Sequence, residues 1–241
     1  MARFLSPSRP GRQAGALYNL GWWIGRLIVW FTLGSVVLVV LFRFVPPPLT
    51  FTMLTDPNGF TKDWTPLSQI DRNMVAAVIA AEDGKFCSHN GFDQEAIEQA
   101  IERNAQGKRL RGGSTISQQT AKNVFLWQGT GWTRWARKGL EAWFTFLIEA
   151  LWDKRRIMEV YLNVAETGIG TYGVEAGAQR YYSKSAARLS ALEAARMAAV
   201  LPSPKTRSVN NPRGFTRRYG NTIAARIRVV RNEGLDACVY R

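Results

Sequence analysis

The side chains best suited to acid–base chemistry are Glu82 and Asp83, which end a predicted helix and precede the single histidine, His89. The carboxyl end of a helix carries partial negative charge, so a carboxylate placed there is disfavoured as an anion. A raised proton affinity of this kind suits a general base or a general acid. The alternative is a pair of solvated acids at a helix end, and this segment alone does not decide.

A second candidate is the helix start that follows a pair of glycines. Thr115 and Gln118 have the T-x-x-Q spacing of a capping box. Such a start presents backbone N–H groups and the positive end of the helix dipole, which together can bind an anion. Lys122 and Asn123 follow one turn later. The spacing of a phosphate-binding P-loop is absent, and a helix start without any ligand is the alternative.

A third cluster lies further along the chain on another predicted helix. Arg137 and Glu141 are four residues apart and Lys138 and Glu141 are three apart, so their side chains share one face. The simple interpretation is a surface ion pair of little energetic consequence. A carboxylate held by cations could instead orient a sugar or stabilise positive charge at an anomeric carbon.

The elements that would position these residues are predicted to be helices. Ser68 can cap a helix that runs through residues 74–79 and ends at Gly84. Further helices are expected at 94–105, 115–126, 133–152, 154–164, from a capping box at Ser190 to just before Pro202, and at 217–231. Residues 50–53 could form a strand, residues 56–59 indicate a turn, and no segment past residue 60 alternates as strands do.

The most apolar stretch, Leu27–Phe42, contains no charged residue and is closed by Arg26 and Arg43. It is slightly short for a bilayer core of about 20 residues, but flanking arginines can snorkel. It has neither the polar stripe of a core helix nor a following cleavage site, so an uncleaved membrane anchor is expected. The basic, acid-free N-terminal side predicts a cytoplasmic N-terminus, with everything after Pro48 outside.

These observations predict a cytoplasmic basic tail at 1–21, a transmembrane anchor at 22–45, a linker at 46–66 and one domain at 67–241. The formal net charge of +14 calls for an anionic partner: nucleic acid, an acidic membrane surface or a phosphate-bearing substrate. Cys87 and Cys238 are too few for a disulfide framework. Whether they pair is left open, because the sequence does not show that their Cβ atoms meet.

Five motifs occur in a fixed order along the chain. They are E-D-x-x-F-x-x-H-x-G at 82–91, G-G-S-T-I-S-Q-Q at 112–119, R-K-x-x-E at 137–141, K-x-x-I-x-E-x-Y-L-N at 154–163 and G-T-Y-G-V-E-A-G-A at 170–178. This series closely resembles the peptidoglycan glycosyltransferases, specifically the monofunctional biosynthetic transglycosylases, from about residue 66 to residue 212. The departures are small: Ser117 stands where Thr is common, and Y-Y-S-K replaces Y-F-G-K at 181–184.

The resemblance implies a mainly α, lysozyme-like glycosyltransferase domain after a single transmembrane helix. It implies polymerisation of lipid II into β-1,4-linked glycan strands, with inversion and release of undecaprenyl pyrophosphate. Glu82 would be the general base and Glu141 would assist near the leaving pyrophosphate, whose charge Lys122 and Arg137 would neutralise. The other residues expected to bind substrate are Asp83, Phe86, His89, Thr115, Gln118, Gln119, Asn123 and Lys138.

The resemblance also implies a location in the cell inner membrane with a periplasmic domain. The expected partners are lipid II, the nascent glycan on undecaprenyl pyrophosphate and membrane lipid. Cell-division or elongation proteins are further candidates, and nucleic acid is not expected outside the membrane. No metal site is predicted, although a divalent cation, Mg²⁺ or Mn²⁺, bound with the substrate pyrophosphate is left open.

Two rival functions remain for such a chain, a lytic enzyme that cleaves glycan strands and a non-enzymatic scaffold for cell-wall machinery. The cations of the second and third motifs argue against the lytic enzyme, because polysaccharide cleavage involves no pyrophosphate. The S-x-x-K and K-T-G elements of a penicillin-binding transpeptidase are absent from the sequence. The chain is therefore expected to make strands without crosslinking them.

Overall fold

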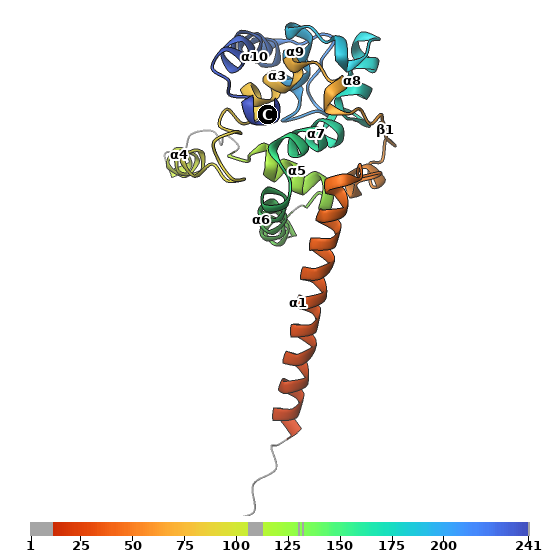
Figure 1. Ribbon diagram of the computed structural model, residues 1–241, viewed down its shortest axis with the longest axis vertical. Coiled ribbons are helices and arrows are strands. Elements are labelled where there is room, and N and C mark those ends of the chain that lie inside the picture. The colour runs from red at the N-terminus through yellow and green to blue at the C-terminus, as the bar shows by residue number, and fades with distance from the viewer. Residues whose placement is uncertain (1–11, 106–112, 130, 132, 241) are drawn as a thin grey trace, which may run out of the picture. The chain divides into compact units, whose positions relative to one another are not determined.

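The computed structural model describes residues 12–105, 113–129, 131 and 133–240, and most of them are helical (Figure 1). The predicted tail up to residue 11 and Gly112 of the glycine pair lie outside the described residues. The chain divides into two compact units, Met1–Leu41 and Phe42–Arg241. The α-helices are α1 (Arg12–Phe44), α2 (Phe51–Leu54), α3 (Arg72–Glu82), α4 (Gln94–Ala105), α5 (Ile116–Phe125), α6 (Thr133–Leu151), α7 (Lys154–Val164), α8 (Val174–Tyr182), α9 (Ala191–Val200), α10 (Gly214–Asn232) and α11 (Ala237–Tyr240).

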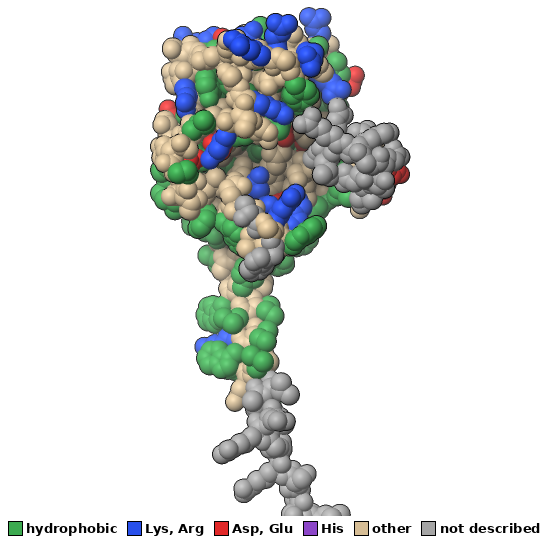
Figure 2. Space-filling model, turned by 180° about the vertical axis from the view of Figure 1, so that it is seen from behind, with side chains coloured by type: hydrophobic (Ala, Val, Ile, Leu, Met, Phe, Trp, Pro, Cys, Tyr) green, Lys and Arg blue, Asp and Glu red, His purple; other side chains and the backbone are tan. Residues whose placement is uncertain are grey.

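The helix α1 is apolar and exposed along most of its length. Its segment Tyr18–Phe44 is long and apolar enough to cross a membrane, judged by length and composition. Large side chains such as Leu27, Trp30 and Val37 are exposed, and Figure 2 shows hydrophobic side chains along this helix. Contiguous apolar surface of this extent is unfavourable in water. The helix is therefore consistent with the membrane anchoring that the sequence predicts.

The core of the second unit is built around α3, which α9 and α10 contact directly (Figure 1). Residues 74–79 of α3 are all buried, as expected for a helix that is covered on several sides. At its carboxyl end, the backbone carbonyl of Ala81 accepts a hydrogen bond from the Tyr219 hydroxyl of α10 at 2.6 Å. The packing therefore holds the end of α3, where Glu82 lies, in a defined place.

A second group of helices, α5, α6 and α7, pack against one another. The rings of Phe125 on α5 and Phe144 on α6 stack with their centroids 4.5 Å apart. Offset aromatic stacking of this kind adds to the hydrophobic contribution of the buried rings. It brings the helix that carries Lys122 against the helix that carries Glu141.

Three short strands, β1 (Thr61–Lys62), β2 (Glu166–Gly168) and β3 (Thr171–Tyr172), form one sheet in the order β1-β3-β2. β1 is parallel to β3, and β2 is antiparallel to it. The sequence shows no convincing alternation past residue 60, because strands of two or three residues are too short to display it.

Two local predictions were wrong. Residues 51–54 form the helix α2 instead of a strand, because the Thr50 side chain caps them by accepting the Met53 N–H. Asp71, and not Ser68, caps α3 by accepting the Asn73 N–H, since Ser68 lies in a separate 3-10 turn at Leu67–Gln69. The helix α8 was not predicted at all.

The capping boxes predicted at Thr115 and Ser190 are both confirmed. In each box the hydroxyl accepts the backbone N–H three residues later, and the side chain of that later residue accepts the cap's own N–H. The helix that carries the first pair of acids, α3, ends at Glu82, with Asp83 as its C-cap residue. Gly84 directly follows this cap, so the helix ends on the two acids as the sequence predicted.

Candidate active site

Glu82 ends α3 and directs its carboxylate toward α5. Its Oε2 accepts a hydrogen bond from Gln119 Nε2 at 2.9 Å. Its Oε1 is buried and has no hydrogen-bond partner among the described residues. Burial raises the pKa of Glu82 above its ordinary value, and the Gln119 hydrogen bond and the charges of Arg207 and Lys122 oppose this. The main cause is therefore burial, whereas the sequence pointed to the helix end.

The orientation of the Gln119 amide is fixed from its other side. The buried Tyr161 hydroxyl donates to Gln119 Oε1 at 3.4 Å. With its oxygen facing Tyr161, the amide turns its N–H toward Glu82 Oε2. The Glu82 oxygen that remains unpartnered, Oε1, is therefore the one available to take a proton.

Asp83 is a buried support and not a solvated acid. Its Oδ2 accepts the backbone N–H of Ile116 at 3.0 Å, and its Oδ1 lies 2.9 Å from His89 Nε2. His89 Nδ1 accepts the backbone N–H of Gly91 at 3.1 Å, so in the neutral ring the proton sits on Nε2, which donates to Asp83. Asp83 therefore joins the loop after α3 to the start of α5.

The start of α5 uses its N–H groups within the protein. Besides Ile116, the N–H groups of Thr115 and Gln118 are accepted by the two side chains of the capping box. The Thr115 hydroxyl also donates to the Gly91 carbonyl at 2.6 Å. The anion at this helix start is the protein's own Asp83 carboxylate, which accepts the Ile116 N–H.

Two further predicted substrate-binding residues also lie away from solvent. Gln118 is buried, and Phe86 is completely buried with the Lys154 ammonium 4.7 Å from its ring centroid. In this structure Phe86, Thr115 and Gln118 are buried side chains that support the site. Gln119 and Asn123 on α5 are only half-buried.

Glu141 on α6 is a buried carboxylate held by two cations. Its Oε2 accepts from Arg137 Nη1 at 2.8 Å, and its Oε1 accepts from Lys138 Nζ. Glu141 is only 3% exposed, so the interpretation as a surface ion pair is wrong. The Nε of Arg137 is buried without a hydrogen-bond partner in the described part of the chain.

The charge of Lys122 interacts with the charges of both glutamates, Glu82 and Glu141. Burial lowers the pKa of Lys122, the charges of Glu141 and Glu82 raise it, and those of Arg137 and Lys138 lower it. Among the described residues, the site thus combines an acid without a salt bridge, Glu82, with an ion-paired acid, Glu141, and three cations. The name central cluster is used below for Glu82, Gln119, Lys122, Arg137, Lys138 and Glu141.

Sequence reasoning missed two residues of this site. Tyr161 lies within the fourth motif, so the motif itself was an available signal. Arg207 lies in the segment after α9, and its charge lowers the pKa of Glu82 against the effect of burial. Its guanidinium is 5.2 Å from the ring centroid of Phe215. No sequence pattern marks Arg207, because its approach to Glu82 depends on tertiary packing.

The described residues contain no group of three or more His, Cys, Asp or Glu side chains that could hold a metal ion. The central cluster itself contributes only two carboxylates, and both oxygens of Glu141 already accept from cations. These side chains do not bear on a divalent cation that arrives with the substrate pyrophosphate, which the sequence left open.

The amino-acid sequence is similar to those of one known protein family. The sequence profile of the Transglycosylase family matches residues 51–228. Biosynthetic peptidoglycan transglycosylases of Caulobacter vibrioides and Rhodospirillum centenum are 50% and 49% identical to the chain, over 86% and 85% of it and 90% and 89% of their own lengths. That of Pseudomonas putida is 48% identical over 80% of the chain and 84% of its own length.

These matches confirm the predicted fold class, a mainly helical, lysozyme-like domain with an N-terminal apolar helix. They also confirm the resemblance that the five motifs carry, since the profile spans all of them. The chain belongs to the Transglycosylase family and is a peptidoglycan glycosyltransferase.

Proposed function

We propose that this glycosyltransferase joins lipid II to a growing glycan chain, forms a β-1,4 bond with inversion and releases undecaprenyl pyrophosphate. One observation carries the proposal: the Oε1 atom of Glu82 is buried and unpartnered, and Lys122, Arg137 and Glu141 form a cation-rich group beside it. A base and an anion-stabilising group are the two parts that displacement of a pyrophosphate by a hydroxyl requires.

In the proposed reaction, Glu82 Oε1 takes the proton from the 4-hydroxyl of the acceptor's GlcNAc. The hydroxyl oxygen forms a bond to C1 of the donor's MurNAc while the bond from C1 to the pyrophosphate oxygen breaks. The bonding electrons leave with the pyrophosphate. Because an α-linked group is displaced from the opposite face, a single displacement gives the β-linked product.

The leaving pyrophosphate would gain negative charge beside Lys122, Arg137 and Lys138. Arg137 keeps a buried, unpartnered Nε, which is available to donate a hydrogen bond to a phosphate oxygen. Both oxygens of Glu141 are occupied by the two cations. Glu141 therefore acts by holding Arg137 and Lys138 in place, and not by contacting the pyrophosphate itself.

The proposed location is the cell inner membrane, with a cytoplasmic N-terminus and a periplasmic catalytic domain. The apolar α1 and the basic residues before it support this orientation. So does the Cys87–Cys238 disulfide, since such bonds persist in oxidising compartments. A maleimide reagent applied to denatured, unreduced cell extract should not label the protein. Labelling of both cysteines would contradict a periplasmic domain.

The reaction is tested by polymerisation of labelled lipid II with the full-length protein in detergent. The parent should make long strands, and Glu82→Gln should lose about 10²- to 10⁴-fold in kcat/KM, the usual contribution of a general base. Because Glu82 must be deprotonated, the parent's kcat/KM should fall as the pH drops through the raised pKa of Glu82. The matched control is Glu95→Gln, an exposed acid on α4, which should retain activity.

Two results would contradict the proposal. Full activity of Glu82→Gln would show that another group is the base. Release of soluble fragments from intact sacculi, without strand synthesis from lipid II, would favour the lytic rival.

A further inference from the structure

Residues 233–240 of the second unit form a short segment that follows α10 and is called the C-terminal strap below. Its Asp236 is fully buried and accepts from Arg72 Nε and Nη2 at 2.7 and 2.8 Å. Its Val239 is fully buried, and the Val239 carbonyl accepts from Arg155 Nη1 at 3.1 Å. The strap is therefore fastened to the first residue of α3 and to α7.

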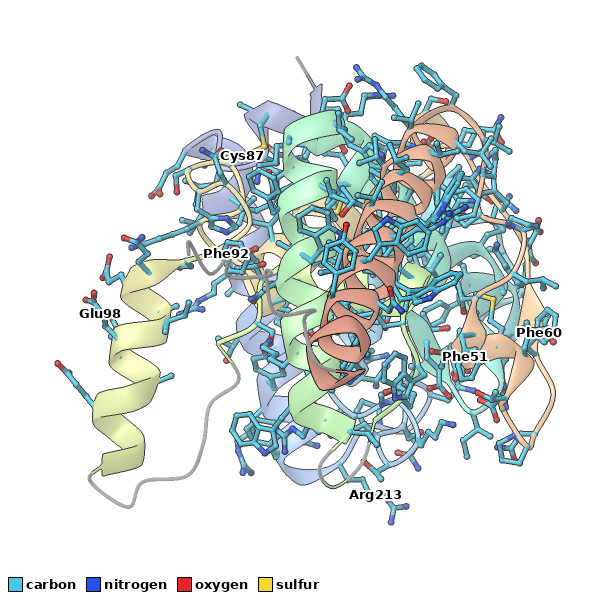
Figure 3. The ribbon with its side chains drawn as sticks, turned by 90° about the horizontal axis from the view of Figure 1, so that it is seen from below. Phe51, Phe60, Cys87, Phe92, Glu98 and Arg213 are labelled. Atoms are coloured by element: carbon cyan, nitrogen blue, oxygen red, sulfur yellow. A yellow bond between two sulfur atoms is a disulfide. The ribbon has the colours of Figure 1, made fainter. Side chains whose placement is uncertain are left out.

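The strap is also joined covalently to the loop between α3 and α4. Cys238 forms a disulfide with Cys87, with the two Cα atoms 5.5 Å apart. Cys87, labelled in Figure 3, lies in that loop between Asp83 and His89. The bond thus ends within the first motif, four residues after Asp83 and two before His89.

Other contacts also hold the loop, on both sides of Cys87. Phe86 is buried, Lys154 Nζ donates to the His89 carbonyl at 2.7 Å, and the Thr115 hydroxyl holds the Gly91 carbonyl. Gly84 and Lys85 are exposed. The disulfide adds a covalent attachment at Cys87, in the turn that brings the His89 ring back to Asp83.

We propose that Cys87 and Cys238 are positioning residues, whose disulfide holds the His89 ring against Asp83. Asp83 in turn keeps Glu82 and the start of α5 in the relative positions that catalysis needs. The order of contacts supports this: Asp83 directly follows Glu82, receives the His89 Nε2–H and accepts the Ile116 N–H. A loop released at Cys87 gives His89 more freedom, and catalysis is sensitive to small misplacements. The inference rests on the proposed role of Glu82.

The bond can be broken selectively. Cys87 and Cys238 are half-buried, and they are the only two cysteines in the chain. Dithiothreitol would transfer two electrons and two protons to the disulfide, giving two thiols and cyclic oxidised dithiothreitol. Any effect of the reductant that needs these cysteines therefore reports on this one bond.

The experiment measures steady-state polymerisation of lipid II by the full-length protein, oxidised and reduced, well below its melting temperature. Reduction should lower kcat severalfold with a smaller change in KM, and the double variant Cys87→Ala/Cys238→Ala should match the reduced enzyme. The double variant should not respond to dithiothreitol. A response of the same size in that variant would overturn the inference.

A matched control separates positioning from stability. Arg72→Gln loosens the strap from α3 but leaves the disulfide intact, so it should lower the melting temperature without lowering kcat below that temperature. Equal losses of kcat in Arg72→Gln and in the cysteine variant, at equal losses of melting temperature, would show that the disulfide is only structural. So would an unchanged kcat on reduction.

The two proposals fail in different ways. An active Glu82→Gln variant would overturn the assignment of the base, whatever the thiol experiments show. An inactive Glu82→Gln variant together with a kcat that reduction does not change would overturn only the role of the disulfide.

Discussion

Glu82 and Glu141 are two glutamates of the same central cluster, both with buried carboxylate oxygens, and their surroundings are opposite. Glu82 has a single side-chain hydrogen bond, from the neutral amide of Gln119, and one oxygen without a partner in the described part of the chain. Glu141 has a cation on each oxygen, Arg137 on one and Lys138 on the other. One carboxylate is set up to accept a proton, and the other organises positive charge.

The difference shows that burial alone does not decide what a carboxylate does. Burial removes water from both carboxylates, but direct ion pairs compensate for this loss only at Glu141. At Glu82 the nearest compensation is a neutral donor and more distant charges, so burial prevails and the pKa rises. Removing the charge from each residue should therefore have opposite effects on stability.

Glu141→Gln is expected to give the larger effect, a loss of stability of roughly 3 kcal/mol. Breaking a buried ion pair leaves the other charge uncompensated, here mainly Arg137, whose side chain is only 11% exposed. The estimate lies at the low end of the usual range because Lys138 is half-exposed and a glutamine oxygen still accepts a hydrogen bond. Denaturant unfolding of the detergent-solubilised protein measures the change.

The control for this prediction is Glu95→Gln. Glu95 pairs with Lys85, but both side chains are at least half exposed, so this substitution should change stability by less than about 1 kcal/mol. If Glu141→Gln were equally mild, the cations would not be compensating a buried charge, and the contrast with Glu82 would lose its basis.

The surroundings of Glu141 were easier to predict from the sequence than those of Glu82. That Arg137, Lys138 and Glu141 meet on α6 could be predicted from their spacing alone, since residues three and four apart on a helix are neighbours. The cap at Thr115 was equally local, and it formed as predicted. Local geometry does not reveal burial, however, so the same spacing was compatible with a surface ion pair until α5 was seen to pack against α6.

The surroundings of Glu82 depend on contacts between segments distant in the sequence. Gln119 lies 37 residues away and Ile116 is 33 residues from Asp83, and no periodicity predicts that α3 and α5 meet there. The Cys87–Cys238 bond spans 151 residues, so the sequence left it open. The ordered motifs indicated which residues share a site, whereas the burial of the Glu82 Oε1 atom could only come from the packed structure.

The smaller effect is expected from Glu82→Gln, and its sign is the reverse. The folded protein holds the Glu82 proton more tightly than the unfolded chain, because the pKa is raised above 4.5. The contribution of Glu82 to the parent's stability should therefore be fully present below pH 4.5 and be lost as the pH rises through the interval up to the raised pKa. The loss is about 1.4 kcal/mol for each unit by which the pKa is raised.

The glutamine introduced by Glu82→Gln does not titrate, so the melting temperature of this variant minus that of the parent should increase across the interval and then stay constant. Thermal unfolding at closely spaced pH values measures this difference, with Glu95→Gln as an exposed acid that should show no such rise. A Glu82→Gln variant that is destabilised at pH 7 as much as at pH 4 would mean that partners hold Glu82 as an anion, as Arg137 and Lys138 hold Glu141. The proton acceptor would then have to be sought elsewhere in the central cluster.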